Sequence, residues 1–218
     1  MLKILSFTLR VRKRLFTAHL LNTLRCMTNL LLVWHSEPAW GPENPPSKWE
    51  LTERGRQRSR SLGDYFVERR VGAVFASPEL KAAQTAEIAT QVAGQSNVVL
   101  VHDLRDLREH EREESQIIGD AERQKLVIDC IRRPDELIYG SEPVQTATYR
   151  FSAAVANLMV DQDAEAVAAV AHGTVIATFV GSILDIDPIP VRESLGLPGL
   201  IEIEWPDSTE IISQRNFD

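Results

Sequence analysis

Three short apolar runs limit the folds open to this chain more than any other feature of the sequence. They cover residues 30–34, 71–76 and 166–171, and none contains a charged residue. Uninterrupted apolar runs of this length are typical of strands buried on both faces, as in parallel sheets covered by helices. Segments with helical patterning, such as residues 52–70, lie between them. Strands separated by helices predict an α/β fold.

The remaining patterns agree with that fold. Further strands are expected at residues 98–101 and in a closing hairpin at 199–205 and 210–214, around the turn 206–208. Further helices are expected at 77–92, 115–131, 142–159 and 174–184, with Ser77 as N-cap and Pro78 in the first turn of the helix at 77–92. Four prolines make residues 37–48 a loop, and residues 103–114 are a charged loop. We therefore predict a three-layer α/β/α sandwich with a mostly parallel sheet over residues 29–218.

Composition removes several classes of protein. The chain has 218 residues, 44% of them hydrophobic, which suits one globular domain and not a disordered chain. Two cysteines do not make a disulfide framework, and no apolar run is long enough to span a membrane. The net charge of −7 argues against a general nucleic-acid binder. A free Cys130 favours a reducing, cytoplasmic location.

Residues 1–28 differ from the rest of the chain. This leader contains basic residues and no acidic ones, whereas the remainder has 18 basic and 31 acidic residues. Three interpretations are open: translation starting at Met27, a helix that binds a membrane surface or a partner, and an organelle-targeting segment. A secretory signal fits less well, because His19 and Asn22 interrupt the apolar stretch. The leader is left out of the fold prediction.

Ligands of open α/β sheets bind beyond the carboxyl ends of the strands. His35 and Ser36 follow the first predicted strand, Ser77 the second, and His172-Gly173-Thr174 the strand at 166–171. The third strand is followed by a cluster of acidic and basic residues. Two of only five histidines at equivalent strand ends suggest a shared site.

Such a set of residues suits phosphoryl transfer through histidine. A neutral imidazole attacks phosphorus and forms a covalent intermediate, cations stabilise the transferring oxygens, and a carboxylic acid protonates the leaving alcohol. This chemistry requires no metal or other cofactor. A zinc site is a poorer alternative, because the histidines lack the spacing of a zinc motif.

The sequence also resembles the histidine phosphatase superfamily, the phosphoglycerate mutase-like group. Five segments match in order: LLLVWHSEP at 30–38, LTERGRQRSRSLG at 51–63, ASPELKAAQTAEIA at 76–89, LRDLRE at 104–109 and AVAAVAHGT at 166–174. The resemblance runs from about residue 29 to 212 and implies a phosphoglycerate mutase-like fold. It further implies that His35 is the phosphorylated residue, that His172 contacts the phosphoryl group and that Glu109 is the proton donor. Glu111 is a weaker candidate for the donor.

The sequence departs from the family pattern in the phosphate pocket. Trp34 stands where the family has the arginine before the nucleophile, Lys81 replaces a second phosphate-binding arginine, and Ser36 replaces a glycine. Lysine lacks the planar fork of arginine, and losing one preorganised donor can cost roughly 3–4 kcal/mol at a transition state. The expected substrate-binding residues are Trp34, Ser36, Lys81 and Gly173, with Arg105 and Arg108 (and less so Arg112) as compensating cations. Trp34 either stacks on a substrate, together with Trp40 and Trp49, or fills the space of the lost arginine.

Three functions follow in order of preference. The first is a phosphomonoesterase that hydrolyses a small phosphorylated metabolite through His35. The second is an inactive binding or regulatory domain with the same fold, and the third is a phosphoglycerate mutase-type phosphotransferase. The expected partners are a small phosphorylated molecule or inorganic phosphate, with no nucleic acid. The sequence leaves the substrate and the oligomeric state open.

Overall fold

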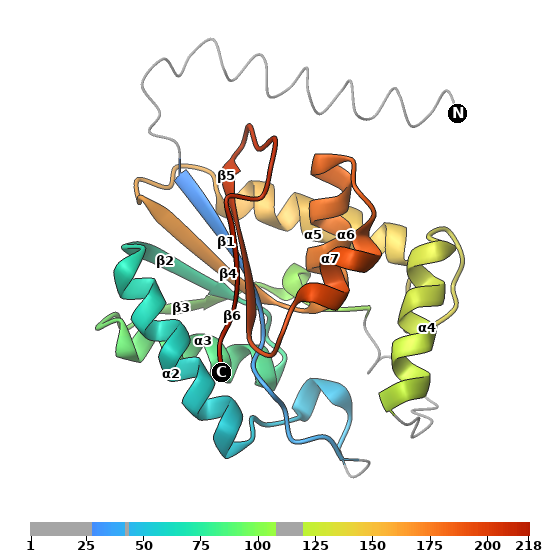
Figure 1. The fold of residues 1–218 in the computed structure, drawn as a ribbon, viewed down its shortest axis with the longest axis horizontal. Helices are drawn as coiled ribbons and strands as arrows, with labels where there is room; N and C mark the ends of the chain where they lie inside the picture. Colours follow the sequence, from blue (N-terminus) through green and yellow to red (C-terminus); the bar gives the residue numbers. More distant parts are fainter. Residues whose placement is uncertain (1–27, 42–43, 108–119) are drawn as a thin grey trace.

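The computed structural model describes residues 28–41, 44–107 and 120–218. Its centre is a six-stranded sheet with the order β3-β2-β4-β1-β5-β6 (Figure 1). The strands are β1 (Thr28–Trp34), β2 (Val71–Ala76), β3 (Val98–Leu100), β4 (Ala166–Ala171), β5 (Gly199–Trp205) and β6 (Ser213–Asn216). β1 to β4 are parallel, whereas β5 and β6 form an antiparallel hairpin that pairs with β1. The mostly parallel sheet predicted from the apolar runs is confirmed.

Helices cover both faces of this sheet (Figure 1). α2 (Glu53–Glu68) and α3 (Leu80–Val92) lie on one face. α5 (Val144–Leu158) and α6 (Gly173–Leu184) lie on the other, with α4 (Asp120–Arg132) and α7 (Pro188–Ser194) beside them. The three-layer arrangement follows from the strand sequences, because apolar side chains on both faces of β1 and β4 require cover.

Alternation along β1 divides the core into two parts. Leu31 and Val33 pack with α2 and α3, whereas Leu30 and Leu32 pack with α5 and α6. All four side chains are fully buried. Each leucine or valine therefore contributes about 1.5–3 kcal/mol of burial free energy to one of the two layers.

Three local predictions need correction. α3 begins at Leu80, with Glu79 at the N-cap position but without a hydrogen bond from its side chain to the helix. Ser77 is therefore not the N-cap and Pro78 lies before the first turn; the hydroxyl of Ser77 instead accepts the Glu79 N–H at 3.3 Å. The helix α7 was not predicted, although Asp187 caps it and Pro188 opens it. The last strand, β6, begins at Ser213, three residues after the predicted start.

The edge strand β3 is short, and the side chains of Val99 and Leu100 are exposed. The loop predicted at 37–48 contains a 3-10 turn, Pro46–Lys48, where Pro46 fixes the first backbone angle of the turn. The predictions for residues 1–27 and 108–119 lie outside the described residues. In the described part of the chain, no helix is both long and apolar enough to cross a membrane.

Candidate active site

The parallel register places the two histidines side by side. Trp34, the last residue of β1, pairs with Ala171, the last residue of β4, so His35 and His172 leave the sheet at the same level. Their ring centroids are 5.2 Å apart, and both side chains are buried. The predicted meeting of the two strand ends is therefore present in the structure.

His35 has a defined tautomer. Its Nδ1 lies 2.8 Å from the carbonyl oxygen of Ser36, which can only accept, so Nδ1 carries the proton. Nε2 is then left with a lone pair, and the indole Nε1–H of Trp34 donates to it at 3.2 Å. Burial lowers the pKa of His35 well below its usual value, helped by the charge of Lys81. The imidazole is thus neutral at pH 7, as a nucleophile requires.

His172 is the N-cap residue of α6 and is also held neutral. Its Nε2 lies 2.9 Å from Ser77 Oγ and 3.6 Å from a carboxylate oxygen of Glu79. Burial lowers its pKa to about 3; Glu79 opposes this effect, whereas Lys81 adds to it. Gly173 and Thr174, the first two residues of α6, line the pocket next to His172.

Glu79 and Lys81 form a buried ion pair with 2.6 Å between Oε2 and Nζ. Burial alone would raise the pKa of Glu79, but the charges of His172 and Lys81 and the hydrogen bond from Lys81 outweigh it and hold that pKa below its ordinary value. Since His172 is neutral at pH 7, Lys81 is the partner that keeps the carboxylate ionised. Lys81 also donates to the carbonyl oxygen of Pro46 at 2.8 Å and so attaches the proline-rich loop to α3.

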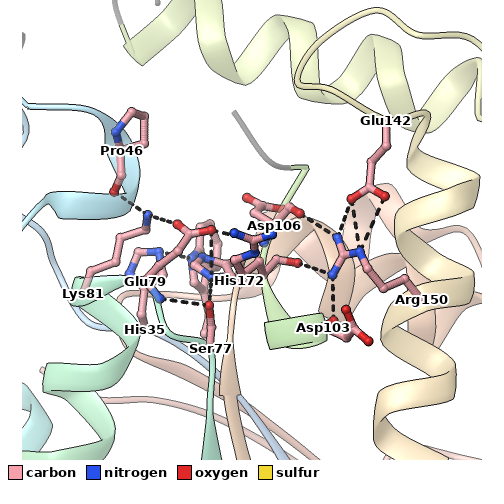
Figure 2. A network of polar contacts seen from close by, with 12 residues as sticks. His35, Pro46, Ser77, Glu79, Lys81, Asp103, Asp106, Glu142, Arg150 and His172 are labelled. Carbon is pink, nitrogen blue, oxygen red and sulfur yellow. Dashed lines mark hydrogen bonds and ion pairs between the residues drawn. The ribbon is translucent and has the colours of Figure 1, made fainter. Parts of the chain in front are cut away.

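These contacts belong to a longer polar network, which Figure 2 shows from Pro46 to Glu142. The backbone N–H of Asp106 donates to Glu79, and Arg150 of α5 donates to the carbonyl oxygens of Asp103, Arg105 and Asp106. Arg150 is in turn paired with Glu142, with 2.5 Å between Nη2 and Oε1. The clamp formed by Arg150 and Glu142 fixes residues 103–106 beside the histidines.

The pocket at this edge of the sheet combines residues from most of the chain. Its lining is Trp34, His35, Pro46, Ser47, Glu79, Lys81, Asp106, Arg123, Val127, Gly173, Thr174 and Arg192. Of the expected substrate-binding residues, Trp34, Lys81 and Gly173 are among these. Arg105 is buried but is not among the lining residues, and Glu109 and Arg108 lie outside the described residues.

Ser36 has a different position from the other expected residues. Its hydroxyl donates to the carbonyl oxygen of Gly55 at 2.8 Å, and its N–H donates to Thr85 Oγ1 at 2.9 Å. Gly55 is required here, because a Cβ at this position would lie 2.3 Å from the carbonyl oxygen of Glu37. Ser36 therefore connects the end of β1 to α2 and α3.

Three charged residues of the pocket were missed by the sequence analysis: Glu79, Arg123 and Arg192. Glu79 lies two residues before Lys81 in a segment already singled out, so its position was a usable signal. Arg192 is buried on α7, with its guanidinium carbon 5.3 Å from the ring centroid of Trp34. The guanidinium carbon of Arg123, on α4, lies 4.5 Å from the ring centroid of Trp40 and 5.7 Å from that of Trp49. No local sequence pattern indicates either contact.

The fold and the pocket together define a class: α/β proteins with two buried histidines at neighbouring strand ends of a mostly parallel sheet. The chain belongs to the histidine phosphatase superfamily (branch 1), whose model matches residues 30–217. It is 26% identical over 195 residues to the protein described as uncharacterized phosphatase PhoE of Bacillus subtilis (strain 168), covering 88% of this chain and 96% of that protein. The family resemblance noted in the sequence is confirmed.

Solved structures agree on the fold. YhfR of Bacillus stearothermophilus has a TM-score of 0.68 at 23% identity and covers 85% of this chain and 95% of its own. A variant of phosphoserine phosphatase from Entamoeba histolytica, in complex with phosphoserine, has a TM-score of 0.65 at 19% identity, with 86% and 96% covered. A mycobacterial glucosyl-3-phosphoglycerate phosphatase has a TM-score of 0.63 at 20% identity, with 87% and 97% covered.

Proposed function

We propose that the chain is a phosphomonoesterase that hydrolyses a small phosphorylated metabolite through a phosphohistidine at His35. The observation that carries the proposal is the state of His35: buried, protonated on Nδ1 by its bond to Ser36, and with the Nε2 lone pair facing the pocket residue Trp34. An imidazole in this state attacks phosphorus without first losing a proton.

The reaction has two steps. The Nε2 lone pair forms a bond to phosphorus while the ester P–O bond breaks, and the leaving oxygen takes a proton from an acid, for which Glu109 is proposed on the family resemblance. Water then attacks phosphorus and gives a proton to the carboxylate left by the first step, the P–N bond breaks, and inorganic phosphate leaves with neutral His35 and the protonated acid restored. Glu79 does not serve as the acid, because its pairing with Lys81 keeps it ionised.

Trp34 must change its hydrogen bond during the first step. Its Nε1–H occupies the Nε2 lone pair of His35 in the resting site, so attack requires that bond to break. Once phosphorus is bonded to Nε2, the indole N–H has a phosphoryl oxygen within its reach in place of the nitrogen. Trp34 then acts as a neutral hydrogen-bond donor beside His35, whose ring also packs against that of His172.

A second candidate function is a phosphate-binding domain without turnover. The same Trp34 bond supports it, because a lone pair that accepts a hydrogen bond is less available for attack. The ion pair of Glu79 and Lys81 also supports it, because it offsets a cation of the pocket. A mutase is the weakest of the three, since its phosphoglycerate substrate carries a carboxylate besides the phosphate and this pocket already contains the buried carboxylate of Glu79.

Hydrolysis of p-nitrophenyl phosphate by the full chain separates these candidates. We expect turnover by the wild-type protein and a loss of at least a thousandfold in His35→Ala, because the nucleophile is removed. Trp34→Arg is the informative companion, since it frees Nε2 and adds a donor fork. An inert wild type with an active Trp34→Arg variant, or inactivity of all three proteins, would contradict turnover as the natural function and favour the binding domain.

A further inference from the structure

The contact between Arg192 and Trp34 suggests where the phosphate-binding charge of the pocket comes from. We infer that Arg192 of α7 is a phosphoryl-binding residue, held in place by the ring of Trp34. The inference rests on the proposed function, in that it assigns a binding residue to the same site. It also gives Trp34 a role beyond filling space.

Position is the first argument. Arg192 is buried, with 6% of its surface exposed, and it lines the same pocket as His35, Gly173 and Thr174. Its guanidinium carbon lies 5.3 Å from the ring centroid of Trp34, and the indole nitrogen of Trp34 is 3.2 Å from Nε2 of His35. The same indole ring therefore contacts both the guanidinium of Arg192 and the Nε2 atom of His35.

Charge is the second argument. Lys81 is paired with Glu79 at 2.6 Å and donates a further described hydrogen bond to the carbonyl oxygen of Pro46. The other cations that line the described pocket are Arg123 and Arg192, and Asp106 adds one further carboxylate. A phosphate group at His35 is dianionic near pH 7, and a guanidinium is the side chain best suited to bind two of its oxygens.

The indole ring of Trp34, over which the guanidinium of Arg192 lies, is itself held in place by packing. Trp34 packs directly on the backbone of Gly173, where a Cβ would lie only 2.7 Å from its ring carbons. A tryptophan fixed in this way presents a constant surface to a cation, which the face of the indole ring attracts. Trp34 thus keeps Arg192 close to His35 and prevents it from turning to solvent.

In this pocket the hydrogen-bond donor and the positive charge come from two different residues, Trp34 and Arg192. The family resemblance places an arginine directly before the nucleophile, whereas in this chain that position supplies an N–H donor and a ring. The positive charge comes instead from a helix that lies more than 150 residues further along the sequence. Phosphate affinity should therefore depend on Trp34 and Arg192 as a coupled pair.

Titration of the full chain with inorganic phosphate by calorimetry tests this inference. We expect Arg192→Met to weaken phosphate binding by tenfold to a hundredfold, about the range for loss of a charge-assisted hydrogen bond, and Arg192→Lys to fall between this variant and wild type. Trp34→Phe keeps a ring under Arg192 and should bind more tightly than Trp34→Leu. The difference between these two variants should disappear in the Arg192→Met background, because the ring then has no cation to hold.

Arg215→Met is the matched control. Arg215 also stacks on a ring, 4.6 Å from the centroid of Tyr65, but it is on β6 and does not line the pocket. Its loss removes the same charge and should leave phosphate affinity within twofold of wild type. Thermal melting without phosphate identifies a variant that fails to fold, and Arg192→Lys answers the question if Arg192→Met does so.

The outcomes separate this inference from the proposed function. Equal phosphate affinity in wild type, Arg192→Met and Arg192→Lys, or no phosphate binding by wild type, overturns the inference even if p-nitrophenyl phosphate is hydrolysed. A loss of affinity equal to that of Arg215→Met also overturns it, since the effect would then be one of overall charge. An Arg192-dependent affinity in a protein without hydrolase activity supports the inference and contradicts the proposed function.

Discussion

His172 is a buried imidazole whose surroundings oppose its protonation. Burial is the largest cause, and the lowered pKa of about 3 means that the folded protein keeps this ring neutral where an unfolded chain would protonate it. The unfolded state therefore binds an extra proton below about pH 6.5, and stability falls as the pH drops through that value. His35 shifts in the same direction.

We predict that the free energy of unfolding decreases by about 2 kcal/mol between pH 6.5 and pH 5 through His172 alone. The measurement is urea denaturation at both pH values for wild type and His172→Gln, which has no titrating group at this position. Glu79 does not contribute in this window, because its ordinary pKa of 4.5 lies below it and its folded pKa is lower still. An equal decrease in both proteins would show that His172 is not the group responsible.

Among the single residues of the site, the sequence predicts those that directly follow a buried strand. His35 and His172 follow strands whose apolar runs are unmistakable, so their meeting could be foreseen. Arg192 could not be, because its contact with Trp34 depends on how α7 folds back across the sheet edge. Glu109 stays a prediction from resemblance, since it lies outside the described residues.

Among the elements, α5 contributes to the site through one side chain, that of Arg150, which holds residues 103–106 in place. Arg150 donates to three backbone carbonyl oxygens of residues 103–106, and its described side-chain partner is the carboxylate of Glu142. Both side chains of the pair are about nine-tenths buried. Removing one member of a buried ion pair leaves the other charge in the protein interior, which typically costs 3–5 kcal/mol.

We therefore expect Arg150→Ala to destabilise the protein by about 3 kcal/mol, measured by urea denaturation. Addition of Glu142→Gln should recover part of this loss, because the remaining side chain is then neutral. The control is Arg133→Ala, which removes an exposed pair with Glu136 and should change stability by less than about 0.5 kcal/mol. A similar cost for Arg133→Ala and Arg150→Ala would mean that the buried clamp has no special weight.

The elements also show where sequence patterns fail. The bounds of strands β1, β2 and β4 agree with the predicted runs to within two residues, because both faces of these strands are apolar. α7 was missed, since its seven residues are too few to show a helical period, although Asp187 and Pro188 mark its start. The start of α3 was placed too early because Ser77 suits an N-cap, whereas its hydroxyl binds His172 and the N–H of Glu79.

For the whole molecule, ligand binding and folding are linked. The pocket collects side chains from β1, α3, α4, α6 and α7, so a phosphate bound there would contact several elements of the fold. A ligand that binds only the folded state stabilises it by about 2.7 kcal/mol at a hundred times its dissociation constant. In a chain of this length that corresponds to a rise in melting temperature of roughly 5–10 °C.

We predict such a rise when inorganic phosphate is added to the full chain, measured by differential scanning calorimetry at pH 7. Sodium chloride at matched ionic strength is the comparison, because it screens surface charges without filling the pocket. Identical melting temperatures in the two salts would contradict a phosphate site in this protein. The rise should be smaller in Arg192→Met at the same phosphate concentration.

The hydroxyl and N–H of Ser36 have a consequence for how such a protein can change. They attach the segment that contains His35 to α2 and α3, whereas Arg123 and Arg192 reach the pocket from α4 and α7. His35 and two of the cations around it are therefore anchored in different parts of the molecule. If His35 is the nucleophile, as proposed, substitutions in α4 and α7 alter the binding of a ligand while the ring of His35 keeps its place, so that binding and chemistry change separately on this scaffold.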